Sequence, residues 1–336
     1  MNGRKLPGGI SPPNIKFHEG QSMDTMDATM AGERFRLAGA LTPELESAFY
    51  SAASRLAAGE IERLYICGLI DRVRRGDLSV YSLLCGGEVA GAICYRSVDG
   101  EAELVHGFVA PEHEGAEGVF LGMVTEALAR CGTRVIRSGF SWPGQARFSG
   151  AAAAAGFAAV SRISMARDVA EGEMFSFVPS PGVSVTPWSA ADFEDVSRLM
   201  HEASAPADRR VYPLFASPGG SRALLLSIVQ GRHGAFEPGL SAVAEVRGET
   251  AGFLLSSLMP DGGVLVLDVA VKEGLRRKGI ASHMIRYLIS RCAAAGRRQI
   301  VLAVTAENVE AVGLYRKMGF REIAAFEQHV LMIEKP

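Results

Sequence analysis

The chain has 336 residues, which is long for one ordinary domain and suits two. Its hydrophobic content of 48% and charged content of 21% are typical of a globular protein with a sizeable core. A formal charge of -2 argues against nucleic-acid binding, and no apolar run is long enough to span a membrane. The cysteines are odd in number and lack metal-ligand spacing, which favours reduced thiols in a cytoplasmic protein: Cys67, Cys85, Cys94, Cys131 and Cys292.

The N-terminal half begins with a segment rich in Pro, Gly, Met, Asp and Thr, and we expect residues 1–33 to form a flexible leader. Helical sequence follows from Thr42 to Arg75, with a break near Gly59. The remaining elements alternate in type. We expect strands at 78–85, 89–96 and 102–109, a helix at 119–131, a strand at 134–140, an alanine-rich helix ending at 156, and a strand at 160–167.

The C-terminal half repeats this order after a linker at 169–183 that contains Pro179 and Pro181. We expect helices at 188–203 and 221–230 and strands at 240–246, 250–257 and 264–271, followed by a helix, a strand at 299–304 and a closing helix. The repeat predicts two tandem α+β domains, at 34–168 and 184–336, each with a mixed, mostly antiparallel sheet flanked by helices.

A basic turn follows the strand that ends at Val271. It consists of Arg276, Arg277, Lys278, Gly279, Ile280 and Ala281. A helix that begins near Gly279 leaves its first amide groups without intrahelical partners, and three cations add positive charge at the same place. This arrangement predicts a pyrophosphate-binding turn, although a solvated basic loop before an ordinary helix is the alternative.

The next strand leads to a second motif, Asn308, Tyr315 and Gly319-Phe320, in the closing helix. The two motifs in this order resemble the acetyl-CoA-binding half of the GNAT N-acetyltransferase superfamily. The resemblance implies two tandem GNAT-like domains that use acetyl-CoA as co-substrate and no metal. It implies these cofactor-binding residues: Leu267, Val269, Val271, Arg276, Arg277, Lys278, Gly279, Ile280, Ala281, Asn308 and Tyr315.

Asp268 and Tyr315 are the candidate catalytic residues. Asp268 is a lone acid in an apolar strand, so it either faces a cleft as a base or substrate anchor, or pairs with a structural neighbour. Glu245 is a weaker second candidate. In the family, the two motif-bearing strands splay apart around the thioester, and the tyrosine approaches its sulfur. We expect Tyr315 to donate a hydrogen bond to the departing thiolate, unless it only packs beside Leu314 and Met318.

The N-terminal copy lacks the residues of both motifs. Glu114 and Glu117 stand where the basic turn is expected, so a pyrophosphate would meet repulsion. Ala152 replaces Tyr315, and Gln145 replaces Asn308. We therefore expect a degenerate GNAT-like domain that does not bind acetyl-CoA.

The favoured function is transfer of an acetyl group to a primary amine of a small molecule or peptide by direct attack on the thioester. The alternative is a non-catalytic acetyl-CoA sensor or interaction module. We expect a monomer or homodimer with no nucleic-acid or membrane partner. Residues 202–232 should shape the acceptor pocket, but their mixture favours no single acceptor: Asp208, Arg209, Arg210, Tyr212 and Phe215.

Overall fold

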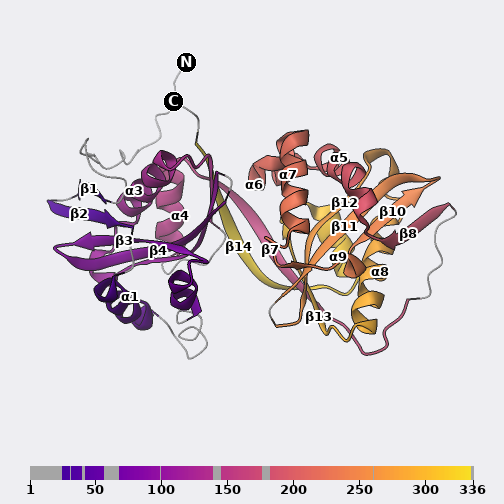
Figure 1. Cartoon of the computed structure of the whole chain (residues 1–336), viewed down its shortest axis with the longest axis horizontal. Helices are drawn as coiled ribbons and strands as arrows, with labels where there is room; N and C mark the ends of the chain where they lie inside the picture. Colours follow the sequence, from indigo (N-terminus) through magenta and orange to yellow (C-terminus); the bar gives the residue numbers. More distant parts are fainter. Residues whose placement is uncertain are drawn as a thin grey trace, which may run out of the picture. The chain divides into compact units, whose positions relative to one another are not determined.

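A computed structural model describes residues 25–30, 32–39, 42–56, 68–98, 100–138, 145–175, 182–259 and 261–333. The chain forms two compact units (Figure 1). Unit 1 comprises residues 1–159 and 328–336, and unit 2 comprises residues 160–327. These boundaries differ from the expected 34–168 and 184–336, because the last strand of each half pairs within the other unit's sheet. None of the helices in the described ranges is both long and apolar enough to cross a membrane.

Unit 1 is a sheet with helices on both faces. The strand order is β1 (Thr25–Met30), β2 (Glu33–Ala38), β3 (Ser79–Cys85), β4 (Glu88–Val98), β5 (Glu101–Val109), β6 (Val135–Ser138) and the end of β14 (Arg321–Met332). The β5–β6 pair is parallel, and the other pairs are antiparallel. One face packs on α3 (Glu117–Arg130) and α4 (Gln145–Ala154). The other packs on α1 (Pro43–Leu56) and the helical residues 68–74.

The expected flexible leader is corrected at its C-terminal end, because residues 25–30 form β1. Met26 and Ala28 are buried while Thr29 is exposed, which is the alternation of a strand with one face on the core. The polar residues that suggested a leader are the alternate positions of this strand. Residues 1–24 lie outside the described ranges.

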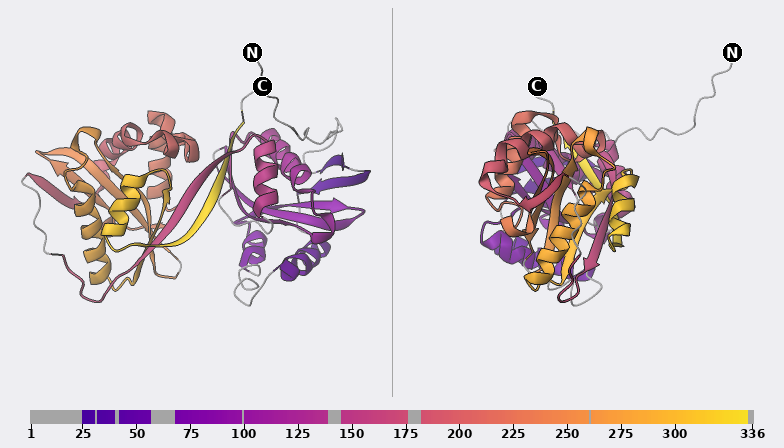
Figure 2. Two further views of the ribbon diagram at one scale, coloured as in Figure 1. Left: turned by 180° about the vertical axis from the view of Figure 1, so that it is seen from behind. Right: turned by 90° about the vertical axis from the view of Figure 1, so that its right-hand side faces the viewer.

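Unit 2 has the strand order β7 (Ala158–Asp168), β13 (Gln299–Thr305), β12 (Val264–Val271), β11 (Glu249–Leu258), β10 (Ala242–Val246) and β8 (Val183–Pro187), with β9 (Ala235–Phe236) beside the end of β11. One face packs on α5 (Phe193–Ala203) and α7 (Pro218–Val229), with α6 (Pro206–Val211) between them in the chain. The other packs on α8 (Ile280–Ala294) and α9 (Val309–Lys317) (Figures 1 and 2). The predicted class, α/β with a mixed, mostly antiparallel sheet and flanking helices, is confirmed.

The two units share three irregularities at matching positions. Leu267 is an extra residue in β12, because Val266 opposes Ser256 and Asp268 opposes the next residue, Leu255. Val105 is the extra residue in β5 for the same reason, and it places His106 where unit 2 has Asp268.

Each unit also has a glycine where two strands approach closely. A Cβ on Gly252 would lie 2.9 Å from the Ala270 carbonyl oxygen, and one on Gly91 would lie 2.7 Å from that of Phe108. The third common feature is a parallel ladder that stops early. It ends at Val266–Leu302 in unit 2, although β12 continues to Val271. The shared bulge, the glycine at the close approach of two strands and the shortened parallel ladder together indicate that the halves are copies of one fold.

Candidate active site in the second unit

The bulge in β12 decides where Asp268 points. Val269 and Val271 pack in the cluster with α8, whereas Ala270 packs in the cluster with α5 and α7. Alternation therefore places Asp268 on the α5–α7 face, together with the bulged Leu267, which packs in that cluster. Because Leu267 is an extra residue, the Asp268 carboxyl group lies on this face, next to the place where β12 and β13 stop pairing.

The gap itself arises because β12 and β13 diverge. Three residue pairs join them, from Val264–Ile300 to Val266–Leu302, and the described ladder goes no further. On its other edge β12 remains paired with β11 as far as Val271. The backbone groups of Leu267, Val269 and Val271 on the β13 side are thus placed to pair with an extended, amide-bearing ligand, as an added strand would.

Asp268 lies among charges that act on its ionisation. The pKa of the Asp268 carboxyl is raised to about 7, mainly by burial and also by the nearby Asp208, while a hydrogen bond with the Val269 backbone and the charge of Arg162 lower it. The sequence predicted a site role for Asp268. It placed Asp208 in the acceptor region without a specific role, and it gave no role to Arg162.

Arg162 reaches this place from β7, the exchanged last strand of the N-terminal half. Its Nη1 donates to the Thr305 hydroxyl at 2.8 Å, its Nη2 donates to the Ala303 carbonyl at 3.0 Å, and the Thr305 hydroxyl donates to Asp208 at 3.1 Å. The guanidinium carbon lies 5.9 Å from the centre of the Tyr212 ring. Arg162 and Thr305 are 6% and 1% exposed, so this is a buried polar network.

Tyr315 projects from α9 and is 8% exposed, with its ring 5.7 Å from that of Phe320 in an edge-to-face arrangement. Burial raises the pKa of its hydroxyl well above the usual value, and the carboxylates of Asp268 and Asp208 raise it further. The structure thus brings Asp268 and Tyr315 into one electrostatic environment. At neutral pH this tyrosine holds its proton.

The basic turn has the backbone of an anion-binding nest. Arg277 has φ 64° and Gly279 has φ 81°, both left-handed, and Gly279 is the N-cap residue of α8. The first helical bond runs from the His283 amide to the Gly279 carbonyl. The amides of the first turn of α8 therefore have no intrahelical acceptor, and the αL residues curve the preceding amides toward one point.

A left-handed arginine is unusual, because αL costs a residue with a side chain about 1–2 kcal/mol. Such a conformation in a loop that precedes a helix is typical of a functional constraint. The side chain of Arg277 is 77% exposed, and its guanidinium lies 3.2 Å from Glu310. Its contribution to an anion site is therefore backbone shape and a distant charge.

The other two cationic side chains of the turn stabilise its conformation through hydrogen bonds to backbone carbonyl oxygens. Arg276 donates to the carbonyl oxygens of Val271 and Ala203 at 3.2 and 3.0 Å. The Lys278 ammonium group donates to the Gly274 carbonyl at 3.3 Å. Both remain exposed, so each combines a structural role with a positive charge near the nest.

Two further sequence candidates lie outside the Asp268 group. The Asn308 side chain caps α9 by accepting the Ala311 amide at 3.2 Å, which accounts for its place in the motif. Glu245 lies on β10, which β11 separates from β12.

The matching turn of unit 1 is filled by its own side chains. The Glu117 carboxylate, 4% exposed at the start of α3, accepts the Gly115 amide at 2.8 Å. Arg147 donates to Glu117 at 2.9 Å and to Glu114 at 3.0 Å. A carboxylate therefore already bonds a turn amide that a bound phosphate would use. Across the fold, Ala152 is fully buried where unit 2 has Tyr315.

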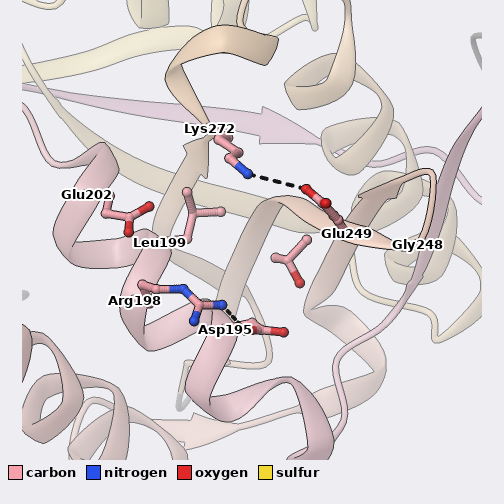
Figure 3. A pocket seen from close by; sticks show the side chains of 8 residues that line it. Asp195, Arg198, Leu199, Glu202, Gly248, Glu249 and Lys272 are labelled. Carbon is pink, nitrogen blue, oxygen red and sulfur yellow. Dashed lines mark hydrogen bonds and ion pairs between the residues drawn. The ribbon is translucent and has the colours of Figure 1, made fainter.

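A separate cavity of about 210 Å³ lies between α5 and the turn that joins β10 to β11 (Figure 3). Four of its charged groups form two pairs: Arg198 with Asp195, and Lys272 with Glu249 at 3.5 Å. No residue predicted for the cofactor or for catalysis lines it. The lining residues are Asp195, Arg198, Leu199, Glu202, Gly248, Glu249, Thr250 and Lys272.

Comparison with known proteins agrees with this geometry. Residues 214–320 match the model of the acetyltransferase (GNAT) family. Over 81 residues the chain is 35% identical to the spore coat polysaccharide biosynthesis protein SpsD of Bacillus subtilis (strain 168). That stretch covers 24% of this chain and 28% of the relative, so the chain spans less than a third of that protein.

Two solved structures show the same fold across both units. One is a GCN5-related N-acetyltransferase from Sphaerobacter thermophilus, with a TM-score of 0.59, 17% identity, and coverage of 89% of this chain and 95% of that one. The other is a glucosamine N-acetyltransferase region of a fungal multi-domain β-N-acetylglucosaminidase, with a TM-score of 0.57, 12% identity, and coverage of 91% and 39%. These matches lead to one conclusion: residues 214–320 belong to the acetyltransferase (GNAT) family, and both units have the fold of solved GNAT structures.

Proposed function

We propose that the chain is an acetyl-CoA-dependent N-acetyltransferase whose site lies in unit 2, in the gap between β12 and β13. The observation that carries the proposal is the convergence on this gap of Asp268 from a strand bulge and Tyr315 from α9. Each would be an expensive buried polar group without a function to explain it. Acetyl transfer to a primary amine of a small molecule or peptide uses both.

Acetyl-CoA fits the two backbone features of the site. The nest formed by residues 276–281 offers amide groups and positive charge to the pyrophosphate. The unpaired edge of β12 offers alternating N–H and C=O groups to the amides of the pantetheine arm. These interactions would set the thioester beside Asp268 and Tyr315.

The acceptor amine must lose a proton before it attacks. An alkylamine of pKa about 10.4 is charged at pH 7, and its neutral form lies about 4.6 kcal/mol higher. The carboxylates of Asp208 and Asp268 attract the cation, and a base of pKa about 7 is well matched to work at neutral pH. One proton of the ammonium group passes to solvent, the neutral nitrogen attacks the thioester carbon, the C–S bond breaks, and Asp268 takes the second proton that the nitrogen then releases.

Tyr315 stabilises the leaving thiolate of coenzyme A in this proposal. Its hydroxyl has a raised pKa, so full proton transfer to a thiolate of pKa about 8.5 is unfavourable. A hydrogen bond from the hydroxyl strengthens as negative charge develops on sulfur, which is the condition for lowering a barrier. Tyr315 is therefore a donor to the thiolate in this proposal, and solvent protonates the product.

The test is Tyr315→Phe, which keeps the ring and removes the hydroxyl. We expect turnover to fall roughly 10–1000-fold, or about 1.4–4 kcal/mol, with little change in acetyl-CoA affinity. Thiol release is measured over a panel of peptides, polyamines and amino sugars. Amino sugars are included because the matched Bacillus relative is named for polysaccharide biosynthesis. Wild-type turnover in the mutant, with chemistry rate-limiting, would contradict the role of Tyr315. Tight acetyl-CoA binding without transfer to any amine would favour a sensor.

A further inference from the structure

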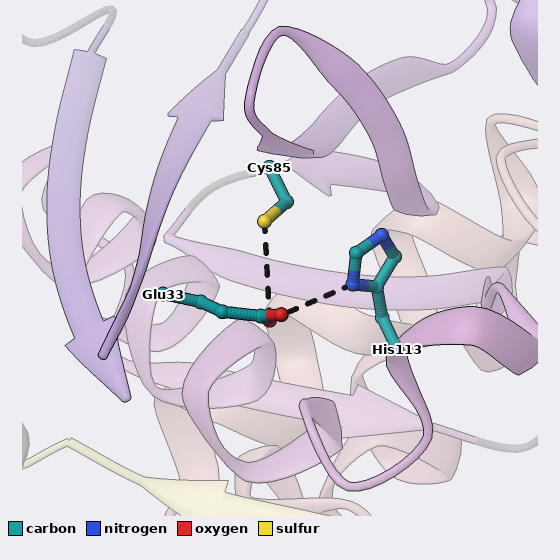
Figure 4. A group of neighbouring side chains, drawn as sticks. All are labelled: Glu33, Cys85 and His113. Carbon is teal, nitrogen blue, oxygen red and sulfur yellow. Dashed lines mark hydrogen bonds and ion pairs between the residues drawn. The ribbon is translucent and has the colours of Figure 1, made fainter. Parts of the chain in front are cut away.

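Three side chains with metal-ligating atoms meet in unit 1. Glu33 begins β2, Cys85 ends β3, and His113 ends a short 3-10 helix, Pro111–His113, that follows β5. Figure 4 shows the three side chains converging on one point. Their donor atoms all lie within 4.8 Å of one another, which makes them the one group of three or more His, Cys, Asp or Glu side chains among the described residues that could hold a metal ion.

The distances leave room for one ion. A Glu33 carboxylate oxygen lies 3.7 Å from His113 Nδ1 and 3.9 Å from Cys85 Sγ. Zinc–ligand bonds of about 2.0–2.3 Å in a tetrahedron place ligand atoms about 3.3–3.7 Å apart. The three donor atoms lie within 4.8 Å of one another, so side-chain movements of about an ångström would bring them to these separations.

His113 supplies an independent sign that a ligand belongs here. Its Nδ1 is buried without a hydrogen-bond partner, since Glu33 is beyond hydrogen-bond distance. The ring stands edge-on to Phe35, with 6.1 Å between centroids and an interplanar angle of 82°, so packing fixes its direction. A buried ring nitrogen without a partner is costly, and a metal ion bonded to it would remove that cost.

We propose that Glu33, Cys85 and His113 bind one Zn²⁺ ion in unit 1, with water in the fourth position. A thiolate, an imidazole and a carboxylate are the ligand types that zinc takes in proteins, and the thiolate selects against Mg²⁺ and Ca²⁺. The ion would join β2 and β3 to the 3-10 helix. It would therefore stabilise unit 1 by mass action, independently of acetyl transfer in unit 2.

The experiment uses the full chain without a polyhistidine tag, freed of metal by a chelator. Native mass spectrometry with added Zn²⁺ should show one ion bound per chain. Titration with Co²⁺ should produce a thiolate-to-cobalt charge-transfer band, which Zn²⁺ then removes. The absence of bound zinc in the wild type would overturn the proposal.

Variants decide whether these three residues hold the ion. Cys85→Ser should abolish the cobalt band, and Cys131→Ser, which removes an exposed thiol at the end of α3, is the matched control that should keep it. Glu33→Gln lies on the surface, so the fold should tolerate it, and we expect zinc affinity to fall at least tenfold. An unchanged band in Cys85→Ser, or unchanged affinity in Glu33→Gln, would each contradict the site.

Discussion

In unit 2 the protein environment shifts the pKa of single residues away from their values in water, and Asp268 is the clearest case. A carboxyl with a pKa of about 7 in the folded chain and about 3.9 in the unfolded chain binds its proton more tightly when folded. Its contribution to stability is therefore fully present below about pH 4 and is lost as the pH rises toward 7. The folded state therefore loses stability over the pH range in which the Asp268 carboxyl group becomes ionised.

Asp268→Asn separates these two effects. We expect turnover to fall at least 100-fold, because the amide cannot accept the proton, and the acid limb of the wild-type kcat/KM profile to titrate near pH 7. The mutant should also gain stability over the wild type between pH 5 and pH 8, by about 2 kcal/mol. Denaturant unfolding at both pH values measures the gain. An equal difference at the two pH values would mean that Asp268 is ionised throughout.

The residues around Asp268 could not be predicted from the sequence, although Asp268 itself could. The acid was recognisable because it interrupts an apolar strand, and Tyr315 because it has fixed spacing from Gly319. Arg162 and Thr305 carry no such signal. Arg162 lies more than a hundred residues from Asp268, and their proximity depends on the pairing of β7 with β13, which no local pattern records.

At the scale of elements, we expect the basic turn to act through backbone conformation more than through side-chain charge. Gly279 holds φ 81° at the start of α8, while the side chain of Arg277 extends into solvent. The glycine was predicted from its spacing. The left-handed arginine was not, because most sequence patterns give no sign of a positive φ outside glycine, asparagine and aspartate.

This difference predicts unequal effects of two substitutions. Gly279→Glu strains an αL backbone and adds a negative charge at the nest, so we expect acetyl-CoA affinity to fall at least 100-fold. Arg277→Ala removes one exposed charge and should cost less than tenfold. Isothermal titration measures both, with Arg321→Ala as a surface-charge control remote from the turn. Similar affinities for Gly279→Glu and wild type would remove the nest from the cofactor site.

The strands show a second limit of sequence reasoning. Those with strong apolar runs, such as β11 and β12, were predicted nearly residue for residue. The short β8 and β9 and the long β14 were not, since β14 has five successive exposed residues from Arg321 to Ala325. Its buried end instead completes the sheet of unit 1 by pairing with β6.

At the scale of the whole molecule, strand exchange makes each unit depend on both halves of the sequence. Unit 2 contains β7, which pairs with β13 through seven residue pairs and brings Arg162 to Thr305. Residues 182–336 expressed alone would lack this strand. We expect that fragment to aggregate or to unfold without cooperativity, and to recover when residues 1–175 are co-expressed. Thermal melting and co-purification measure the two outcomes. A fragment that folds alone and binds acetyl-CoA like the full chain would show that β7 is dispensable.

The differences between the two copies predict how many acetyl-CoA molecules one chain binds. Unit 1 keeps the bulge and the glycine of the fold, but Glu117 occupies its turn and His106 replaces the catalytic candidate Asp268. Burial lowers the pKa of His106 to about 4, so it is neutral at pH 7 and adds no charge to offset the two glutamates. We therefore expect calorimetric titration with acetyl-CoA to give one site per chain. Gly279→Glu should abolish that single isotherm, and Arg147→Ala, which disturbs the unit 1 turn, should leave it unchanged. A stoichiometry of two would show that the N-terminal copy also binds the cofactor.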